Sequence, residues 1–342
     1  MKPIRIGISG AGFGAVAHLP ALQNHPGFEV VAIASPSSAA KVAQAANVGA
    51  AFESCEAMLA GCELDAVTVA SPPFTHHHDT IAALRAGKHV LCEKPFALNV
   101  AQAMEMREAL RQAGTVGGIA HEFRFVSQVA AIAELVRNGH LGAVRDVEST
   151  MLRTNLRAQE RRPRSWWFER ERGGGLAGAV LSHLVDQANW LCGAPPKRAA
   201  GALRTANPHR LDDRGTFTST VDDGAAAVLE YPGEVLARLC VDGTTAVESY
   251  TLAVHGERRT AVASGLFMTQ LSLYTIDGDV TEELTCKPSP YAAFESVNHN
   301  VPLLMELYDE FQKAVEGEPN ALPSFDDGVA TQEVLAAIGY GA

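Results

Sequence analysis

The sequence predicts two domains, an α/β domain with a doubly wound parallel sheet and then an α+β domain with a mostly antiparallel sheet. In the first third of the chain, continuous apolar runs alternate with helical patterns of about ten residues, as parallel βαβ units require. From about residue 122 onward, strand-like runs follow one another across short turns, which is typical of antiparallel pairing. The chain of 342 residues is also longer than the roughly 100–200 residues of one domain.

In the first domain, residues 1–121, each predicted strand is a short run dominated by apolar residues. These strands are Ile4–Ser9, Phe28–Ala34, Ala50–Phe52, Ala66–Ala70, His89–Cys92 and Val116–Ala120. Helical patterns lie between them, over Ala15–Leu22, Ala39–Ala46, Ser54–Leu59, Asp79–Ala86 and Asn99–Ala113. Ser54 and Asn99 are predicted N-caps, and Gly114 is a predicted C-terminal stop. The segment Ser71–His78 is predicted as a loop, and ligands are expected at the carboxyl ends of the strands.

The second domain, residues 122–342, contains most of the short turns and the strands that they separate. Its predicted strands are Val144–Leu152, Thr216–Val221, Ala225–Tyr231, Val235–Asp242, Tyr250–His255, Arg259–Ala263 and Phe267–Thr275. Its predicted helices are Gln128–Asn138, Ser182–Leu191, Val301–Val315 and Val329–Ile338. The last two helices are expected to pack back on the first domain.

Composition argues against several classes of protein. Apolar residues make up 47% and charged residues 20%, ordinary values for a globular chain, so a disordered protein or coiled coil is not expected. The net charge of −11 argues against a nucleic-acid binder or a binder of anionic membranes, which need basic surfaces. No apolar run reaches the ~18–20 residues of a membrane span, and the N-terminus has no signal-peptide pattern. The six scattered cysteines form no Cys-x-x-Cys pair, so we expect reduced thiols in a cytoplasmic protein.

A glycine motif follows the first predicted strand and opens a helix. Gly10-x-Gly12-x-x-Ala15 has the spacing of the dinucleotide fingerprint and lies in the βαβ context that the fingerprint requires. Gly10 permits the tight turn, Gly12 lets the backbone approach a pyrophosphate, and Ala15 is small enough for helix–strand packing. Phe13 and Gly14 complete the turn, and the helix N-terminus offers N–H groups to phosphates. We therefore predict that NAD or NADP binds here.

The end of the second strand bears on the choice between these two cofactors. An acidic residue normally stands there and holds the ribose 2′-hydroxyl of NAD. Here the segment reads Ala34-Ser35-Pro36-Ser37-Ser38, so no carboxylate would repel a 2′-phosphate, and Ser35 and Ser37 offer hydroxyls. Although the arginine that often binds the 2′-phosphate is missing, the absence of the carboxylate favours NADP over NAD. Ser37 or Ser38 is also expected to cap the following helix.

Glu93-Lys94-Pro95 follows the strand His89–Cys92, at the carboxyl edge of the predicted sheet. Pro95 directs Lys94 toward extended geometry and permits a cis bond. A lysine at this edge can reach a nicotinamide and a substrate hydroxyl. The alternative is a solvated lysine at the end of a strand.

His183 and Asp186 lie three residues apart on a predicted helix, after Gly173-Gly174-Gly175. Positions with this spacing share a face, so Asp186 can orient or charge-stabilise His183 in acid–base chemistry. The alternative is a capping or core pair.

Three adjacent histidines, His76-His77-His78, suggest a metal site at first sight. We expect no metal there, because adjacent side chains diverge and no Cys or carboxylate cluster accompanies them. His76 is instead expected near the cofactor, with Ser71 and Pro72.

Together these motifs resemble the Gfo/Idh/MocA oxidoreductases, the group of glucose–fructose oxidoreductase and inositol dehydrogenase. The likeness runs nearly from end to end, and its most specific stretch is Ala86–Pro95. Its other parts, in the family's order, are Gly10–Ala15 with His18 and Pro20, Asp65-Ala66-Val67, Ser71-Pro72-Pro73-x-x-His76, Phe123-Arg124-Phe125, Gly173-Gly174-Gly175, His183-x-x-Asp186 and Asp327-Gly328. The resemblance implies a Rossmann domain and a second domain with a large, mostly antiparallel sheet. It also implies a homodimer or homotetramer formed through that sheet.

The resemblance implies hydride transfer between NAD(P) and a sugar, polyol or related carbonyl compound. Lys94 would hydrogen-bond the developing alkoxide, and His183, supported by Asp186, would give or take the proton. Many members read Asp-x-Gly-x-His, whereas Ala179 and Leu181 stand here in place of Asp and Gly. This departure keeps a second hypothesis open: a regulatory protein that binds nucleotide and sugar without turnover, as the family's galactose-regulon repressor does.

The segment Arg153–Arg172 carries a net positive charge, with seven arginines and three glutamates, whereas the whole chain carries a net negative charge. The family places this segment close to the substrate entrance. Arginine forks match carboxylate and phosphate groups, and tryptophan faces stack on sugar rings or guanidinium planes. We therefore expect an anionic substrate, with an interface to an acidic patch of a neighbouring subunit as an equal alternative. The candidate substrate residues are Arg124, Arg162, Arg164, Trp166 and Trp167.

Overall fold

The computed structural model describes residues 2–267 and 270–341, and the chain divides into two compact units. The first unit comprises Met1–Glu122 and Ser289–Val329, and the second comprises Phe123–Pro288 and Ala330–Ala342. The segment Ser289–Val329 therefore belongs to the first unit, although it follows most of the second unit in the sequence.

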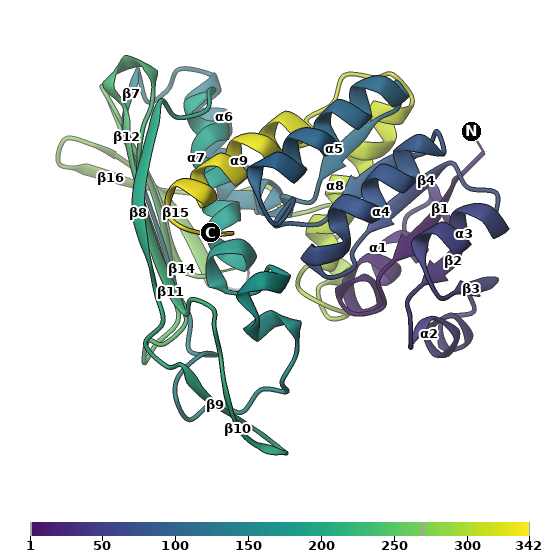
Figure 1. Ribbon diagram of the computed structural model, residues 1–342. Helices are drawn as coiled ribbons and strands as arrows, with labels where there is room; N and C mark the ends of the chain where they lie inside the picture. Colours follow the sequence, from purple (N-terminus) through teal and green to yellow (C-terminus); the bar gives the residue numbers. More distant parts are fainter. Residues whose placement is uncertain (1, 268–269, 342) are drawn as a thin grey trace. The chain divides into compact units, whose positions relative to one another are not determined.

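A six-stranded parallel sheet forms the centre of the first unit, in the order β3-β2-β1-β4-β5-β6 (Figure 1). The predicted parallel sheet is confirmed, and its strands are β1 (Ile4–Ser9), β2 (Phe28–Ala34), β3 (Ala50–Phe52), β4 (Ala66–Val69), β5 (His89–Cys92) and β6 (Gly117–Ile119). The strand order reverses between β1 and β4. Ligands of open α/β sheets bind at the carboxyl ends of the strands where the order reverses. We therefore expect the ligand-binding residues in the segments that follow β1 and β4.

The helices of the first unit begin and end largely where local chemistry predicts. They are α1 (Leu19–Gln23), α2 (Ala39–Ala45), α3 (Cys55–Gly61), α4 (Pro73–Arg85) and α5 (Val100–Ala113). Both predicted N-caps are confirmed, because Ser54 Oγ accepts from Ala57 N at 3.1 Å and Asn99 Oδ1 accepts from Gln102 N at 3.0 Å. Gly114 ends α5 with φ of 64°, in the left-handed region that glycine adopts most easily.

The predicted loop Ser71–His78 is wrong, because α4 begins at Pro73. Pro72 is extended, with ψ of 149°, and precedes the helix as its N-cap. A proline at the first helical position has the required φ and loses no hydrogen bond, since that N–H has no intrahelical partner. The three adjacent histidines therefore lie on a helix.

The segment that returns to the first unit supplies α8 (Val301–Val315), which contacts α1. Its Tyr308 and Phe311 are fully buried. The ring of Phe28 lies 5.2 Å from that of Tyr308 and 6.3 Å from that of Phe311. Burying such rings stabilises a fold by several kcal/mol, on the order of 3–5 for each phenylalanine. The returning helix is thus part of the core of the first unit.

An eight-stranded sheet dominates the second unit, in the order β16-β15-β14-β13-β7-β12-β11-β8 (Figure 1). Among the described strands of this sheet, β7 and β12 pair in parallel and the other neighbours pair antiparallel. The prediction of a mostly antiparallel sheet is confirmed. Its predicted strands are β7 (Val144–Leu152), β11 (Gly224–Glu230), β12 (Leu236–Asp242), β13 (Ser249–Gly256), β14 (Thr260–Leu266) and β15 (Gln270–Asp277).

Several strands differ from the sequence-based prediction. The two edge strands, β8 (Arg198–Arg204) and β16 (Val280–Leu284), were missed because they are largely exposed and show no apolar stripe. The predicted strand Thr216–Val221 is wrong for the large sheet, since β10 (Gly215–Thr218) pairs with β9 (His209–Asp212) in a separate ribbon. Of the predicted strand Phe267–Thr275, positions 268 and 269 lie outside the described residues.

Two helices, α6 (Ser127–Arg137) and α7 (Ser182–Cys192), lie on one face of the large sheet (Figure 1). The last helix, α9 (Phe325–Ala337), begins before the predicted Val329. Ser324 Oγ accepts from Asp327 N at 3.2 Å, and Asp327 Oδ2 accepts from Ser324 N at 2.7 Å, which is a capping box. No helix in the part of the chain that the structure describes is long and apolar enough to cross a bilayer.

Candidate active site

The glycine turn after β1 has a separate steric requirement at each of its glycines. Gly10 has φ of 112°, and a Cβ there would lie 2.2 Å from the carbonyl oxygen of Ala70, so only glycine fits. A Cβ on Gly14 would lie 3.0 Å from Cγ2 of Ile8. At Gly12, by contrast, a Cβ would meet nothing within 4 Å. The turn therefore presents the backbone at Gly12 to open space, which fits the close approach of a pyrophosphate.

A π-helical turn, Gly14–His18, leads from the glycine turn into α1. The amide groups of Ala15 and Val16 both donate to the carbonyl oxygen of Gly12, at 3.1 and 3.3 Å. Turns of this kind are rare and are frequent at functional sites.

The turn after β2 offers hydroxyl groups and no carboxylate. Ser35 is half-buried, and its N–H donates to the carbonyl oxygen of Phe52 at 2.9 Å. Ser37 is exposed, with its Oγ 3.4 Å from Oγ of Ser38. Ser38 precedes α2 but forms no side-chain cap, so the capping expected of Ser37 or Ser38 is wrong. The residues fit a ribose that carries either a 2′-hydroxyl or a 2′-phosphate.

His76 joins two of the predicted cofactor segments. Its Nε2 lies 2.7 Å from the carbonyl oxygen of Ser71, and its Nδ1 lies 2.9 Å from that of Pro95. The hydroxyl of Ser71 in turn donates to Asp79 at 2.9 Å. Burial lowers the pKa of His76, while the two carbonyl contacts oppose that change. The imidazole thus fixes Ser71 and Pro72 relative to Pro95, and the Lys94–Pro95 bond is cis.

The other two histidines of this run turn to separate partners. His77 contacts Glu105 at 2.7 Å, and His78 contacts Glu56 at 2.8 Å. Within residues 2–267 and 270–341, no group of three His, Cys, Asp or Glu side chains is arranged to hold a metal ion.

Glu93 is a buried carboxylate, 4% exposed, at the end of β5. Burial works to raise its pKa, but the charge of Lys94 and the hydrogen bond from His18 outweigh burial and hold the pKa of Glu93 at about 2. One carboxylate oxygen lies 2.8 Å from Nε2 of His18, and the other accepts from the N–H of Lys94 at 3.2 Å. Glu93 is therefore ionised and is an acceptor at both oxygens.

Lys94 lies beside this carboxylate, with Nζ 3.6 Å from Glu93 Oε2. Burial opposes its charge, but the carboxylates of Glu93 and Glu122 outweigh burial and raise the pKa of Lys94 above its ordinary value. Its Nζ also lies 5.5 Å from the centre of the Phe13 ring, in the glycine turn. The lysine is thus held as a cation next to the predicted cofactor site.

Sequence reasoning missed the buried groups that continue this network. His18 is fully buried, and its Nδ1 lies 2.8 Å from the hydroxyl of Tyr308, which lies 2.9 Å from that of Thr68. Because ionised Glu93 only accepts, Nε2 of His18 carries a proton. Tyr308 gave no signal in the sequence, since it reaches the site from α8. His18 was visible only as part of the family's motif.

In the second unit, His183 lies in the first turn of α7 and is 1% exposed. Its ring stacks on that of Phe123, with centroids 3.7 Å apart and planes at 13°. A second π-helical turn, Ala177–Leu181, precedes it and contains Ala179. His183 therefore follows directly after a π-helical turn, whereas Lys94 follows the strand β5.

Arg124 and Asp186 form a buried ion pair in the same unit. The guanidinium donates to both carboxylate oxygens, at 2.7 and 2.6 Å. The side chains are 6% and 1% exposed, and the Arg124 guanidinium lies 5.4 Å from the centre of the Trp190 ring. A predicted substrate residue thus holds a predicted catalytic one, a pairing that the spacing of the sequence did not reveal. Support of His183 by Asp186 stays a prediction.

The other candidate substrate residues lie in the arginine-rich segment. Arg162 stacks on Trp167, with Cζ 4.6 Å from the ring centre. Arg164 lies over Phe217 at 4.8 Å and donates to the carbonyl oxygen of Thr216. Trp166 is half-buried and begins a short 3₁₀ turn with Trp167. Aromatic rings thus hold these guanidinium groups in fixed positions.

Comparison with known proteins agrees with the fold of the two units. Residues 4–121 match a family model described as an oxidoreductase family with an NAD-binding Rossmann fold. Residues 129–262 match the GFO/IDH/MocA C-terminal domain. Together the two matches cover both units of the fold.

Individual relatives include proteins with named activities on sugars. An uncharacterised oxidoreductase of Synechocystis sp. is 33% identical over 265 residues, which cover 76% of this chain and 71% of the relative. The 1,5-anhydro-D-fructose reductase of Ensifer adhaerens is 28% identical over 316 residues, which cover 89% and 85%. A solved structure of levoglucosan dehydrogenase in complex with NADH has a TM-score of 0.85 at 22% identity, and covers 100% of this chain and 97% of its own.

Substitutions at two glycines of the glycine turn should affect stability and cofactor binding differently. Gly12→Val is expected to leave the melting temperature nearly unchanged, because a side chain at this position meets no protein atom within 4 Å. The same change should weaken NADPH and NADH binding by about 10-fold or more, since it closes the approach to the backbone.

Gly10→Ala is the matched comparison and should lower the melting temperature, because its Cβ would overlap Ala70. Calorimetry and fluorescence titration measure the two effects. Normal dinucleotide binding by Gly12→Val would show that the cofactor does not bind at this turn.

Proposed function

Because the chain belongs to the Gfo/Idh/MocA family of oxidoreductases, we propose that it transfers hydride between a nicotinamide dinucleotide and a sugar, polyol or related compound. The reacting carbon is a secondary alcohol or ketone. Support comes from two relatives whose names indicate redox chemistry on sugars, a 1,5-anhydro-D-fructose reductase and a levoglucosan dehydrogenase, the second of them solved with NADH. The observation that carries the proposal is the cationic Lys94, held by Glu93 and adjacent to Phe13 of the glycine turn.

The cofactor would lie on the glycine turn, with its ribose near Ser35 and Ser37. When bound, the nicotinamide supplies or accepts the hydride. We favour NADP, because the turn after β2 has hydroxyls and no carboxylate to repel a 2′-phosphate. Ser71, Pro72 and His76 would line the cofactor from the segment after β4.

Lys94 would donate a hydrogen bond to the oxygen of the reacting carbon as negative charge develops there. Two neighbouring carboxylates keep it protonated, so it stabilises charge without moving the proton itself. His183 would give or take that proton. Asp186 and Arg124 would act as positioning residues, because their ion pair anchors α7 to the segment that carries Phe123.

The substrate is proposed to carry an anionic group, on the basis of the arginine-rich segment that includes Arg162 and Arg164. The equal alternative for these arginines is an acidic patch on a second copy of the chain. We also propose a homodimer or homotetramer through the outer face of the large sheet, where Val228 and Leu236 are 47% and 39% exposed. The six free cysteines support the expectation of a reducing, cytoplasmic location.

A second function is favoured by one observation, the alanine at position 179 in place of the family's usual aspartate. A protein without that carboxylate could bind nucleotide and sugar and act as a regulator. Oxidation of NADPH or reduction of NADP in the presence of a panel of keto-sugars and sugar alcohols separates the two functions. Tight sugar binding without any hydride transfer would favour the regulator.

Lys94→Ala is expected to lower kcat by roughly 10²–10⁴-fold, the usual loss when a positioned catalytic group is removed. Cofactor dissociation constants should stay nearly unchanged, because the phosphates are held by the glycine turn. Lys88→Ala, at the opposite end of β5, is the matched control and should leave kcat unaltered. Steady-state kinetics and fluorescence titration test this, and near wild-type kcat in Lys94→Ala would refute the assignment.

Ser35→Asp should shift cofactor preference toward NADH. The new carboxylate would hydrogen-bond a 2′-hydroxyl and repel a 2′-phosphate. The ratio of dissociation constants for NADPH and NADH, measured by fluorescence titration, reports the change. A wild-type protein that already binds NADH clearly more tightly would contradict the preference for NADP.

A further inference from the structure

Arg162 differs from the other arginines of the segment Arg153–Arg172 in its partners. Four of these arginines form ion pairs with glutamate or aspartate: Arg153, Arg157, Arg161 and Arg172. Two more donate to backbone carbonyl oxygens: Arg164 and Arg170. Arg162 is half-buried, and among residues 2–267 and 270–341 no acidic group or carbonyl oxygen accepts from its side chain. Its charge therefore has no internal counterion in the described part of the chain.

A second cation lies close to Arg162. Arg210 is 5% exposed, and its Cζ lies 5.9 Å from the centre of the Phe168 ring, while Cζ of Arg162 lies 5.6 Å from the same centre. Burial, and then the charge of Arg210, lower the pKa of Arg162. Two like charges held against one ring create a local excess of positive potential that an anion would relieve.

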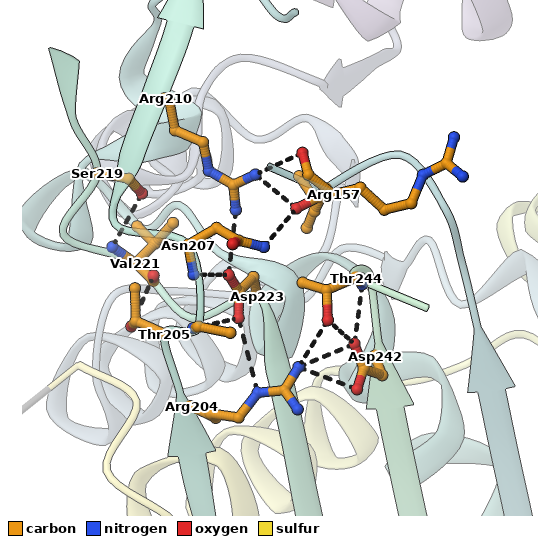
Figure 2. A network of polar contacts seen from close by, with 12 residues as sticks. Arg157, Arg204, Thr205, Asn207, Arg210, Ser219, Val221, Asp223, Asp242 and Thr244 are labelled. Atoms are coloured by element: carbon orange, nitrogen blue, oxygen red, sulfur yellow. Dashed lines mark hydrogen bonds and ion pairs between the residues drawn. The ribbon is translucent and has the colours of Figure 1, made fainter. Parts of the chain in front are cut away.

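The nearby carboxylates are already occupied (Figure 2). Asp223 is 1% exposed and pairs with Arg210 at 3.2 Å and with Arg204 at 3.8 Å. Asp242 accepts twice from the guanidinium of Arg204, at 2.9 Å. Arg204 and Arg210 thus share these two carboxylates, and no ion pair of the described residues joins Arg162 to either of them.

The same network holds the segment in place. Arg210 Nη1 donates to the carbonyl oxygen of Leu156 at 2.6 Å, and Asn207 Nδ2 donates to the same oxygen at 3.3 Å. Nε of Arg210 is buried and has no acceptor among the described residues, so one donor of this guanidinium is unused. The backbone of the segment at Leu156 is therefore attached directly to a second cation.

The segment is also connected to the helix that carries His183. Gly175 N donates to the carbonyl oxygen of Trp167 at 3.1 Å, and Ala179 N donates to that of Gly175 at 3.2 Å. A Cβ on Gly174 would lie 2.1 Å from the Trp167 carbonyl oxygen. The residue on which Arg162 stacks therefore packs directly on the turn that begins the π-helical segment before His183.

We infer that Arg162, stacked on Trp167 beside the buried Arg210, binds the carboxylate or phosphate group of the substrate. This inference rests on the proposed function for the identity of the ligand, but the anion site itself does not. A guanidinium presents paired N–H donors that match both anions, and stacking fixes the plane in which they point. Arg164 lies over Phe217 and already donates to the carbonyl oxygen of Thr216, so the inference is made for Arg162 alone.

Binding of inorganic phosphate and of malonate at constant ionic strength tests the inference, with tryptophan fluorescence as the signal. The three tryptophans, Trp166, Trp167 and Trp190, all belong to the second unit, which also contains Arg162. Wild-type protein should show a saturable change. In Arg162→Gln the affinity should fall by about 10-fold or more, the size expected when a charge-assisted hydrogen bond is lost. The matched control Arg170→Gln should bind as the wild type does, because this guanidinium already donates to the carbonyl oxygen of Thr220.

The melting temperature and the sedimentation coefficient of Arg162→Gln give the second readout. Arg162→Gln relieves repulsion from Arg210 and breaks no ion pair of the described residues, but it loses the stacking on Trp167, so the melting temperature should change little. Equal anion affinity in wild type and Arg162→Gln would overturn the inference. So would a wild type that binds neither anion while Arg162→Gln changes the sedimentation coefficient, since Arg162 would then serve contacts with a second copy. A protein that binds anions through Arg162 but turns over no sugar would contradict the proposed function and leave the anion site standing.

Discussion

The buried charge of Glu93 is the interaction on which the site in the first unit depends. An isolated carboxylate in a protein interior costs several kcal/mol. Two donors, the N–H of Lys94 and the imidazole of His18, and one cation, the Lys94 ammonium at 3.6 Å, offset that cost. The same charge keeps Lys94 protonated despite its burial. One ion pair therefore fixes the position of the lysine and also its protonation state.

The hydrogen bonds that stabilise the charge of Glu93 involve residues far away in the sequence. His18 can serve Glu93 through Nε2 only if its other nitrogen is also satisfied, and the hydroxyl of Tyr308 lies 2.8 Å from it. Tyr308 is on α8, so the helix that returns to the first unit completes the polar network as well as the apolar core. In the second unit the corresponding anchor is the Arg124–Asp186 pair, which fixes α7 as Glu93 fixes Lys94.

Features that depend on a few neighbouring residues were predictable from the sequence. The strands of the first sheet are continuous apolar runs, and the glycine turn is recognised by the spacing of Gly10 and Gly12, so the strands and the turn were both predicted. The edge strands β8 and β16 were not, because an exposed edge needs no apolar pattern. The contact between His18 and Tyr308 spans 290 residues, and no local pattern encodes it. The start of α4 and the capping box at Ser324 were missed, although local patterns encode them. Pro72-Pro73 is typical of a helix start, and Ser324-x-x-Asp327 is the pattern of a capping box.

The central claim is that Glu93 holds Lys94 as a cation, and the pKa of Lys94 tests it most directly. The rate of reductive methylation of Lys94, followed by mass spectrometry across alkaline pH, reports the neutral amine. In the wild type the half-point should lie above the ordinary lysine value of about 10.4, and in Glu93→Gln it should fall below that value, because burial remains and a carboxylate is lost. A wild-type Lys94 that titrates at or below about 10.4, or one that Glu93→Gln does not move, would contradict the account.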